Sequence, residues 1–226
     1  MSRILIFAAH PDDEILGCGG FISKYSKEFN IKVVFLGEGS SCRFEDFKSE
    51  EAFKEIKKRK EFAKKAMGFI KVNNYSFYDL PCGRFDQIPI LEINKIMEKE
   101  INKFNPQIIF THSGCDANND HKIVNKSSIM STRPGAKNRV DKLIEYEVLS
   151  STEWSFSEVF KPNFFEILSE KDVDMKYETL SIYQSEVKKY PFPRSRKGIK
   201  SLAMIRGMQA GAEYAEGYKI IREIKS

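Results

Sequence analysis

Short β-branched or aromatic runs alternate with longer amphipathic stretches through the first 131 residues of the chain. This alternation is typical of βαβ units wound on a parallel sheet. The expected strands span residues 3–9, 31–36, 72–77 and 107–111, and the expected helices span residues 21–27, 49–67, 91–104 and 121–131. The glycine-rich run 17–20 predicts a local break after the first strand, and Gly68 is the expected residue just beyond the second helix.

The last third of the chain has a less regular pattern. Strands are expected at 143–148 and 164–167, a helix at 176–186, and helical spacing of small and apolar residues runs from 200 to 224. No repeat, low-complexity segment or linker divides the sequence. The pattern therefore predicts one α/β domain over residues 1–226, with a mostly parallel sheet and a less regular C-terminal third.

Composition narrows the class of protein. Apolar residues make up 41% of the chain and charged residues 31%, which is a soluble globular composition. The net charge of +5 comes from 37 basic and 32 acidic residues spread along the chain, so obligate nucleic-acid binding is not indicated. The first apolar run is followed at once by charged residues, so neither a signal peptide nor a membrane span is expected and a cytoplasmic location is predicted.

The four cysteines are Cys18, Cys42, Cys82 and Cys115. They stand far apart in the sequence and form no C-x-x-C pair. This spacing argues against both a disulfide framework and a cysteine zinc site. Free thiols in a reducing compartment are therefore expected.

A histidine and three carboxylates follow the first strand directly, in the run His10-Pro11-Asp12-Asp13-Glu14. Ligands of open α/β sheets bind at the carboxyl ends of the strands. Ionisable groups packed at that edge resist burial unless a cation compensates them. His10 and Asp13 can point at one divalent metal around the proline turn, which leaves Asp12 free to act on protons. The alternative is a helix N-terminus at which the carboxylates complement the helix dipole.

A second polar loop follows the fourth expected strand and leads into a helix that Asn119 or Asp120 is available to cap. The candidate residues of this loop are His112, Asp116, Asn118, Asp120 and His121. His121 supplies a third ligand, and two imidazoles with one carboxylate leave a coordination position open for water, as in catalytic zinc sites. Asp120 is the expected carboxylate partner of His121 in the catalytic group. His112 is either catalytic or, like most loop histidines, a surface residue.

Together these residues resemble the PIG-L/LmbE-like family of metal-dependent N-acetylglucosaminyl deacetylases. The run 10–14 matches the family's A-H-P-D-D-E signature, and residues 116–121 followed by Thr132-Arg133-Pro134 match its second metal-binding segment. Shorter matches lie at 37–40, 150–154, 161–164, 183–185 and 211–216, so the resemblance covers most of the chain.

The resemblance implies a Rossmann-like α/β fold with helices on both faces of the sheet. It also implies one divalent metal, of the zinc type, on His10, Asp13 and His121, with Asp12 as the general base. The implied substrate is an N-acetylated amino sugar or sugar conjugate, nucleotide-linked conjugates included. Hydrolysis would release acetate and a free amine.

The chain departs from the family pattern at Asn118, where many members carry a histidine that helps to stabilise the oxyanion. An asparagine amide can donate a hydrogen bond to an oxyanion, but it cannot deliver a proton. The proton for the leaving amine is therefore expected from reprotonated Asp12 or from His112.

The sequence indicates residues that contact the substrate less clearly than it indicates the metal ligands. Arg43, Arg84 and Arg133 fall in loops expected near the active edge, where a guanidinium group would hold sugar hydroxyls, a carboxylate or a phosphate. A solvated surface arginine is the alternative for each of them. Asp116 is a fourth candidate. The basic loop 188–197 with interleaved aromatic residues is interpreted as solvated, with contact to an anionic nucleotide or lipid head group as the alternative.

Other classes of protein fit the sequence less well. In a nucleotide-binding Rossmann protein the third fingerprint glycine would fall at Ile22, and three carboxylates stand where pyrophosphate would bind. No G-x-S-x-G motif indicates a serine hydrolase. A metal-dependent amidase acting on a non-sugar amide and a non-catalytic, metal-dependent sugar-binding protein stay open as alternatives. The expected partner is a small molecule, and the sequence leaves homo-oligomerisation open.

Overall fold

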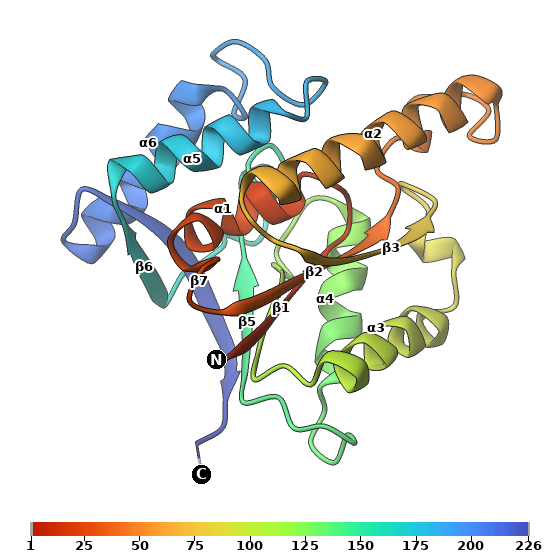
Figure 1. Cartoon of the computed structure of the whole chain (residues 1–226), viewed down its shortest axis with the longest axis horizontal. Helices are drawn as coiled ribbons and strands as arrows, with labels where there is room; N and C mark the ends of the chain where they lie inside the picture. Colours follow the sequence, from red (N-terminus) through yellow and green to blue (C-terminus); the bar gives the residue numbers. More distant parts are fainter. Residues whose placement is uncertain (1, 226) are drawn as a thin grey trace.

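Seven strands form one sheet in the computed structural model, which describes residues 2–225 (Figure 1). The strands are β1 (Arg3–Ala8), β2 (Asn30–Gly37), β3 (Asn74–Leu80), β4 (Ile108–His112), β5 (Lys142–Tyr146), β6 (Phe164–Leu168) and β7 (Tyr214–Glu223). Their order in the sheet is β3-β2-β1-β4-β5-β7-β6. Strands β1 to β5 pair in parallel, and β7 runs antiparallel to both of its neighbours. The predicted mostly parallel sheet is confirmed.

Helices cover both faces of this sheet, as predicted (Figure 1). They are α1 (Asp13–Tyr25), α2 (Glu50–Phe69), α3 (Ile90–Phe104), α4 (Asn119–Ser131), α5 (Glu170–Ser181) and α6 (Arg196–Ala210). Alternate side chains of strand β1 point to the two helical layers on opposite faces of the sheet. Ile4 and Ile6 pack into the cluster that includes α1, α2 and α5, whereas Leu5 and Phe7 pack into the cluster with α3 and α4. Both faces of β1 are buried, which explains its uninterrupted apolar run.

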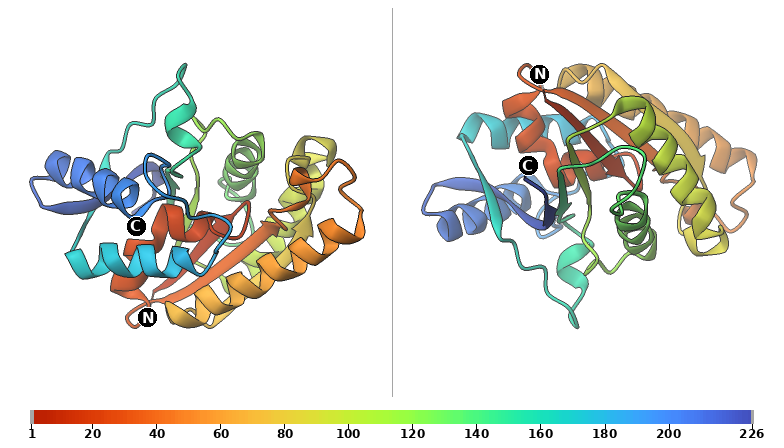
Figure 2. Two further views of the ribbon diagram at one scale, coloured as in Figure 1. Left: turned by 90° about the horizontal axis from the view of Figure 1, so that it is seen from above. Right: turned by 90° about the horizontal axis from the view of Figure 1, so that it is seen from below.

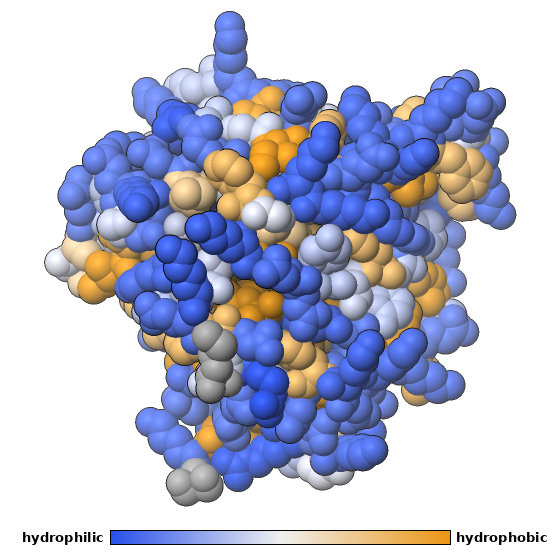
Figure 3. Space-filling view, viewed as in Figure 1, coloured by the Kyte–Doolittle hydropathy of each residue, from blue (hydrophilic) through white to orange (hydrophobic). Residues whose placement is uncertain are grey.

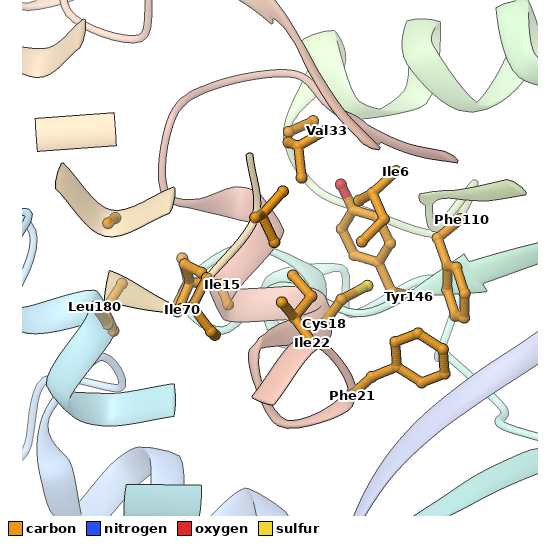
Figure 4. Packing of buried hydrophobic residues seen from close by; sticks show 14 of the residues in the cluster. Ile6, Ile15, Cys18, Phe21, Ile22, Val33, Ile70, Phe110, Tyr146 and Leu180 are labelled. Atoms are coloured by element: carbon orange, nitrogen blue, oxygen red, sulfur yellow. The ribbon is translucent and has the colours of Figure 1, made fainter. Parts of the chain in front are cut away.

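Helix α1 runs straight through the glycine-rich segment, so the predicted break at residues 17–20 is wrong. The reason is packing. A Cβ atom on Gly17 would overlap the ring of Tyr146, one on Gly19 would press on Lys176, and one on Gly20 would overlap Leu168. The glycines therefore let α1 approach its neighbours closely. Figure 4 shows Tyr146 in the same buried cluster as Ile6, Cys18 and Ile22.

We expect Gly17→Ala to lower the free energy of unfolding by about 2–3 kcal/mol, because the added methyl group forces the fully buried Tyr146 to move. The matched control is Gly68→Ala in α2, where an added Cβ meets no atom within 4 Å. There the substitution should stabilise the protein by about 0.5–1 kcal/mol, because alanine favours a helix over glycine. Urea denaturation of both variants measures the difference, and equal stabilities would contradict the packing argument.

Two further predictions at element ends are wrong. Gly68 lies inside α2, and the chain turns instead at Lys71, whose φ is 65°. The segment 200–224 is not one helix, because α6 ends at Ala210, the next residue, Gly211, has a φ of 70°, and the chain continues as β7. Strand β7 fills the space between β5 and β6, and this long-range pairing overrides the helical spacing of its residues.

The order of the strands places a crevice at one point of the sheet. From β1 the chain moves outward through β2 to β3 and then returns to β4 on the opposite side of β1. The connections after β1 and β4 therefore leave the sheet in opposite directions, and ligands of doubly wound sheets bind at such a switch point. The two polar loops singled out in the sequence follow β1 and β4.

The surface of the molecule is mainly hydrophilic on the face shown in Figure 3, with hydrophobic side chains scattered over it. Within residues 2–225, every helix is too short or too polar to cross a membrane. A segment after β5 projects from the body of the molecule (Figure 2). It includes the exposed Trp154, Phe156 and Val159.

Candidate active site

The turn from β1 into α1 holds its side chains in fixed positions. Asp12 precedes the first residue of α1 with a φ of 117°, an unusual conformation for a residue other than glycine. The backbone N–H of His10 donates to Asp13 Oδ2 at 2.8 Å, and the N–H of Asp12 donates to Glu14 Oε2 at 2.9 Å. Tyr183 donates to the other oxygen of Glu14 at 2.7 Å. Glu14 thus stabilises the turn.

The turn and the loop before α4 bring His10, Asp13 and His121 together. Each of these buried residues offers one ligand atom, and the three atoms lie within 4.8 Å of one another. Asp13 Oδ2 is 3.5 Å from His10 Nδ1 and 3.3 Å from His121 Nε2. Two imidazoles and one carboxylate are a donor set that suits a zinc-type ion with an open coordination position.

A second carboxylate faces the far nitrogen of each imidazole. Asp120 Oδ2 is 2.9 Å from His10 Nε2, and Asp116 Oδ2 is 3.2 Å from His121 Nδ1. Such partners fix the ring orientation and the tautomer of metal-binding histidines. The sequence-based pairing of Asp120 with His121 is wrong. Consecutive residues of a helix point about 100° apart, so Asp120 turns to His10 while His121 meets Asp116.

The charges of the cluster also suit a cation. Burial lowers the pKa of both imidazoles, but the surrounding carboxylates outweigh it and raise the pKa of His10 to about 9 and that of His121 to about 10. Burial raises the pKa of Asp13, yet the charge of His121 keeps it well below its usual range. The carboxylates therefore favour positive charge in the cluster, which a divalent ion would supply if it displaced the imidazole protons.

Asp12 lies beside this cluster and is held through one of its two oxygens. Its Oδ2 is 2.6 Å from Arg194 Nη1 and 3.1 Å from Arg59 Nη2. Burial raises the pKa of Asp12 to about 6, although the two arginines oppose the shift. Among residues 2–225, Oδ1 of Asp12 takes part in none of the hydrogen bonds found. That oxygen is available for a reacting water.

Three residues around Asp12 were missed by the sequence reasoning. Glu186 joins Arg59 and lies 3.0 Å from Arg194 Nη1, so it fixes both arginines. Arg194 belongs to the loop 188–197, and the solvated interpretation of that loop is wrong for this residue. The motifs gave no signal for Arg59, which is a buried arginine within a lysine-rich helix.

His112 is fully buried, so the alternative of a surface histidine is wrong. Its Nε2 accepts a hydrogen bond from the N–H of Ala9 at 2.9 Å, and its ring stacks on His121 with centroids 3.9 Å apart. Burial and the charge of His121 lower the pKa of His112 well below its usual value. A neutral, packed ring favours a role in orienting His121 over proton donation.

The sequence profile of the family described as PIG-L, GlcNAc-PI de-N-acetylase, matches residues 5–130. This match covers more than half of the chain and includes both loops that carry the ligand cluster. The chain belongs to the PIG-L family.

Solved structures share the fold of this PIG-L family member at low sequence identity. N,N'-diacetylchitobiose deacetylase from Pyrococcus horikoshii matches with a TM-score of 0.79 and 18% identity, covering 97% of this chain and 84% of that chain. A deacetylase of the teicoplanin biosynthesis pathway matches with a TM-score of 0.76 and 14% identity over 100% of both chains. The 4-carboxy-2-hydroxymuconate hydratase GalB from Pseudomonas putida matches with a TM-score of 0.74 and 21% identity, covering 100% of this chain and 98% of that chain. Since a hydratase shares the fold with deacetylases, the fold by itself does not determine the reaction.

Asn118 is the residue at which this PIG-L chain departs from the family pattern. Its side-chain oxygen accepts a hydrogen bond from the N–H of Asp120 at 2.9 Å and so caps α4. The prediction that Asn119 or Asp120 caps the helix is wrong by one or two positions. The amide nitrogen of Asn118 makes none of the hydrogen bonds found within residues 2–225, so it is free to donate to a ligand.

The four candidate substrate contacts lie in different surroundings. Asp116 is buried and accepts hydrogen bonds from Ser151 and Thr152, which leaves it to orient His121. Arg43 is exposed and pairs with Glu186 at 2.8 Å, and Glu186 also pairs with Arg194, which contacts Asp12. Arg84 stands over the ring of Phe47, next to the two backbone N–H groups that bind Asp120. Arg133 follows the opposite end of α4 and pairs with Glu98, so the structure does not bring it to the site.

Proposed function

We propose that this protein is a metal-dependent deacetylase that hydrolyses the N-acetyl group of an amino sugar or sugar conjugate. The observation that carries the proposal is the buried group of His10, Asp13 and His121 beside a carboxylate with one unengaged oxygen, Asp12. Membership of the PIG-L family supports the reaction class. Of the two deacetylases named among the similar structures, the N,N'-diacetylchitobiose deacetylase supports the sugar substrate.

His10, Asp13 and His121 would hold one divalent cation, most naturally Zn²⁺ for this donor set. When bound, such an ion supplies Lewis-acid polarisation of the acetamide carbonyl and a lower pKa for water. Asp116 and Asp120 keep the two imidazoles in the orientation that ligation requires.

The residues around the cation carry the proton transfers. Oδ1 of Asp12 takes a proton from the attacking water, while Arg59 and Arg194 hold Oδ2 in place. The same carboxyl group then returns the proton to the leaving nitrogen, because neither Asn118 nor the neutral His112 supplies one. The amide of Asn118 donates a hydrogen bond to the oxyanion. Arg43 and Arg84, on loops that border the site, are our candidates for contacts to substrate.

Acetate release from N-acetylated sugars tests the proposal. We expect the purified, metal-loaded protein to release acetate from at least one of a free, a nucleotide-linked and a lipid-linked N-acetyl amino sugar. Treatment with a chelator should abolish the release, and added zinc should restore it, because the donor set serves a cation. Acetate release that survives exhaustive chelation would contradict metal dependence. Release only from acetylated amines that lack a sugar would contradict the substrate class.

A further inference from the structure

Cys42 and Cys82 lie side by side at the rim of the site, although they are far apart in the sequence. Cys42 belongs to the short helical turn η1 (Ser41–Arg43) after β2, and Cys82 follows β3. Their Sγ atoms are 3.0 Å apart, and both thiols are free. The sequence-based argument against a cysteine metal site rested on the wide spacing of the cysteines along the chain, and folding overrides that spacing for this pair.

Glu38 ties the two thiol-bearing loops together. Its carboxylate accepts hydrogen bonds from the N–H groups of Ser40 and Ser41 at 2.6 and 2.9 Å and from the hydroxyl group of Ser41. The same carboxylate accepts the N–H of Cys82 at 2.7 Å. These bonds to both loops, made by a buried side chain, hold Cys42 and Cys82 together before any ligand arrives.

Two further donor atoms face the thiols. Cys82, His10 and Asp120 each offer a ligand atom, and the three atoms lie within 4.8 Å of one another. With Cys42, the group contains two sulfur atoms, one imidazole nitrogen and one carboxylate oxygen. Four such donors suit tetrahedral zinc, and thiolates favour soft cations over Mg²⁺ or Ca²⁺. A zinc–sulfur distance of about 2.3 Å requires the sulfurs to stand roughly 3.8 Å apart, which a small rotation of the exposed Cys42 provides.

The hydrogen bond between the two thiols also favours the deprotonated form of Cys42, which is the form that binds a cation. The hydrogen bond that the Cys82 thiol donates to Cys42 lowers the pKa of the Cys42 thiol below its ordinary value. The proton that remains on Cys82 leaves to solvent when a cation takes its place between the sulfurs.

We propose that Cys42, Cys82, Asp120 and His10 form a second cation site, selective for soft divalent ions such as Zn²⁺, whose occupation inhibits the enzyme. His10 connects the two sites, because its Nδ1 faces Asp13 and its Nε2 faces Asp120. A cation at the thiols would bind Nε2 and Asp120, the Nε2 proton would leave to solvent, and His10 would bridge the two cations as an imidazolate. The hydrogen bond to Asp120 that orients His10 for the first cation would then be lost. The inhibitory part of this inference rests on the proposed function, whereas binding at the thiols does not.

Cadmium titration of the reduced, metal-free protein tests the site, since thiolate ligation of Cd²⁺ produces a charge-transfer absorption that histidine and carboxylate ligands do not. We expect two equivalents to bind to the unmodified chain, one of them with this absorption. Cys42→Ser should remove the absorption and weaken that equivalent by at least about tenfold, because loss of even an outer partner costs 10–100-fold. His121→Ala should keep the absorption and lose the other equivalent. Cys115→Ser, at a cysteine outside the group, is the control.

Inhibition is measured separately, as acetate release with increasing Zn²⁺ beyond one equivalent. Activity of the unmodified chain and of Cys115→Ser should fall, while that of Cys42→Ser should resist the excess by at least about tenfold in zinc concentration. If the unmodified chain binds only one equivalent of cadmium and shows no thiolate charge-transfer absorption, the proposed thiol site does not exist. If the unmodified chain binds two equivalents of cadmium with the absorption, but Cys42→Ser is inhibited by zinc as strongly as the unmodified chain, the thiol site exists and the proposal that it inhibits the enzyme is wrong. If no acetate is released at all, the proposed function fails, and the cadmium result still decides whether the thiol site exists.

Discussion

Replacement of Asp12 by asparagine is expected to lower kcat by about 10²–10⁴, the usual contribution of a general base, while the metal content stays at the level of the unmodified protein. The amide preserves the shape of the side chain, and asparagine tolerates a positive φ well. The Oδ2 contacts to Arg59 and Arg194 can persist through the amide oxygen. Steady-state acetate release together with elemental analysis measures both quantities.

Asn118→Ser is the companion variant. Serine keeps a cap for α4 but is too short to extend an amide donor toward the substrate, so a loss of roughly 10² is expected if Asn118 is one oxyanion donor among several. The order of the two effects is the decisive result. If Asp12→Asn loses its metal, Asp12 is a ligand and the roles of Asp12 and Asp13 are exchanged. If Asp12→Asn keeps both metal and rate, the base is a different group.

Removal of the His121 imidazole is expected to abolish tight metal binding at the His10, Asp13 and His121 group and, with it, activity. His121 and His10 are the two imidazoles of the donor set, and neither Asp13 nor His10 alone holds a zinc-type ion. His121→Ala should therefore elute from gel filtration without the metal equivalent that the unmodified protein retains. His121→Gln, which fills more of the buried space, guards against a loss that arises from packing. Lys126→Ala, an exposed change on the same helix, is the control.

Circular dichroism establishes that each His121 variant is folded before its metal content is compared. A full equivalent of tightly bound metal in both folded variants, measured with Cys42→Ser also present so that the thiol site does not contribute, would remove His121 from the ligand set. The third ligand would then be a different group, and His112 is a poor candidate because its Nε2 already accepts the N–H of Ala9.

Local patterns in the sequence determined the alternation of strands and helices in the first half of the chain, because each strand and helix there buries its own periodic set of apolar residues. They also placed His10, Asp13 and His121 in the segments that follow β1 and β4, where the parallel topology brings them together. Spacing alone did not distinguish close packing from a break at Gly17, because both require a residue without a side chain. Spacing alone also did not show that the C-terminal part of the segment 200–224 is the strand β7 and not a helix.

Only the tertiary structure decided what surrounds those residues. Arg194 meets Asp12 across 182 positions of the chain, and Cys82 meets Cys42 across 40. Asp120 turns to His10, 110 positions away, and not to the histidine beside it. Such contacts depend on where the strands lie in the sheet and on how each loop is anchored, and neither leaves a periodic trace in the sequence. A sequence motif therefore identified the candidate metal ligands. The residues that orient these ligands and hold Asp12, and the contact between Cys42 and Cys82, became visible only in the folded chain.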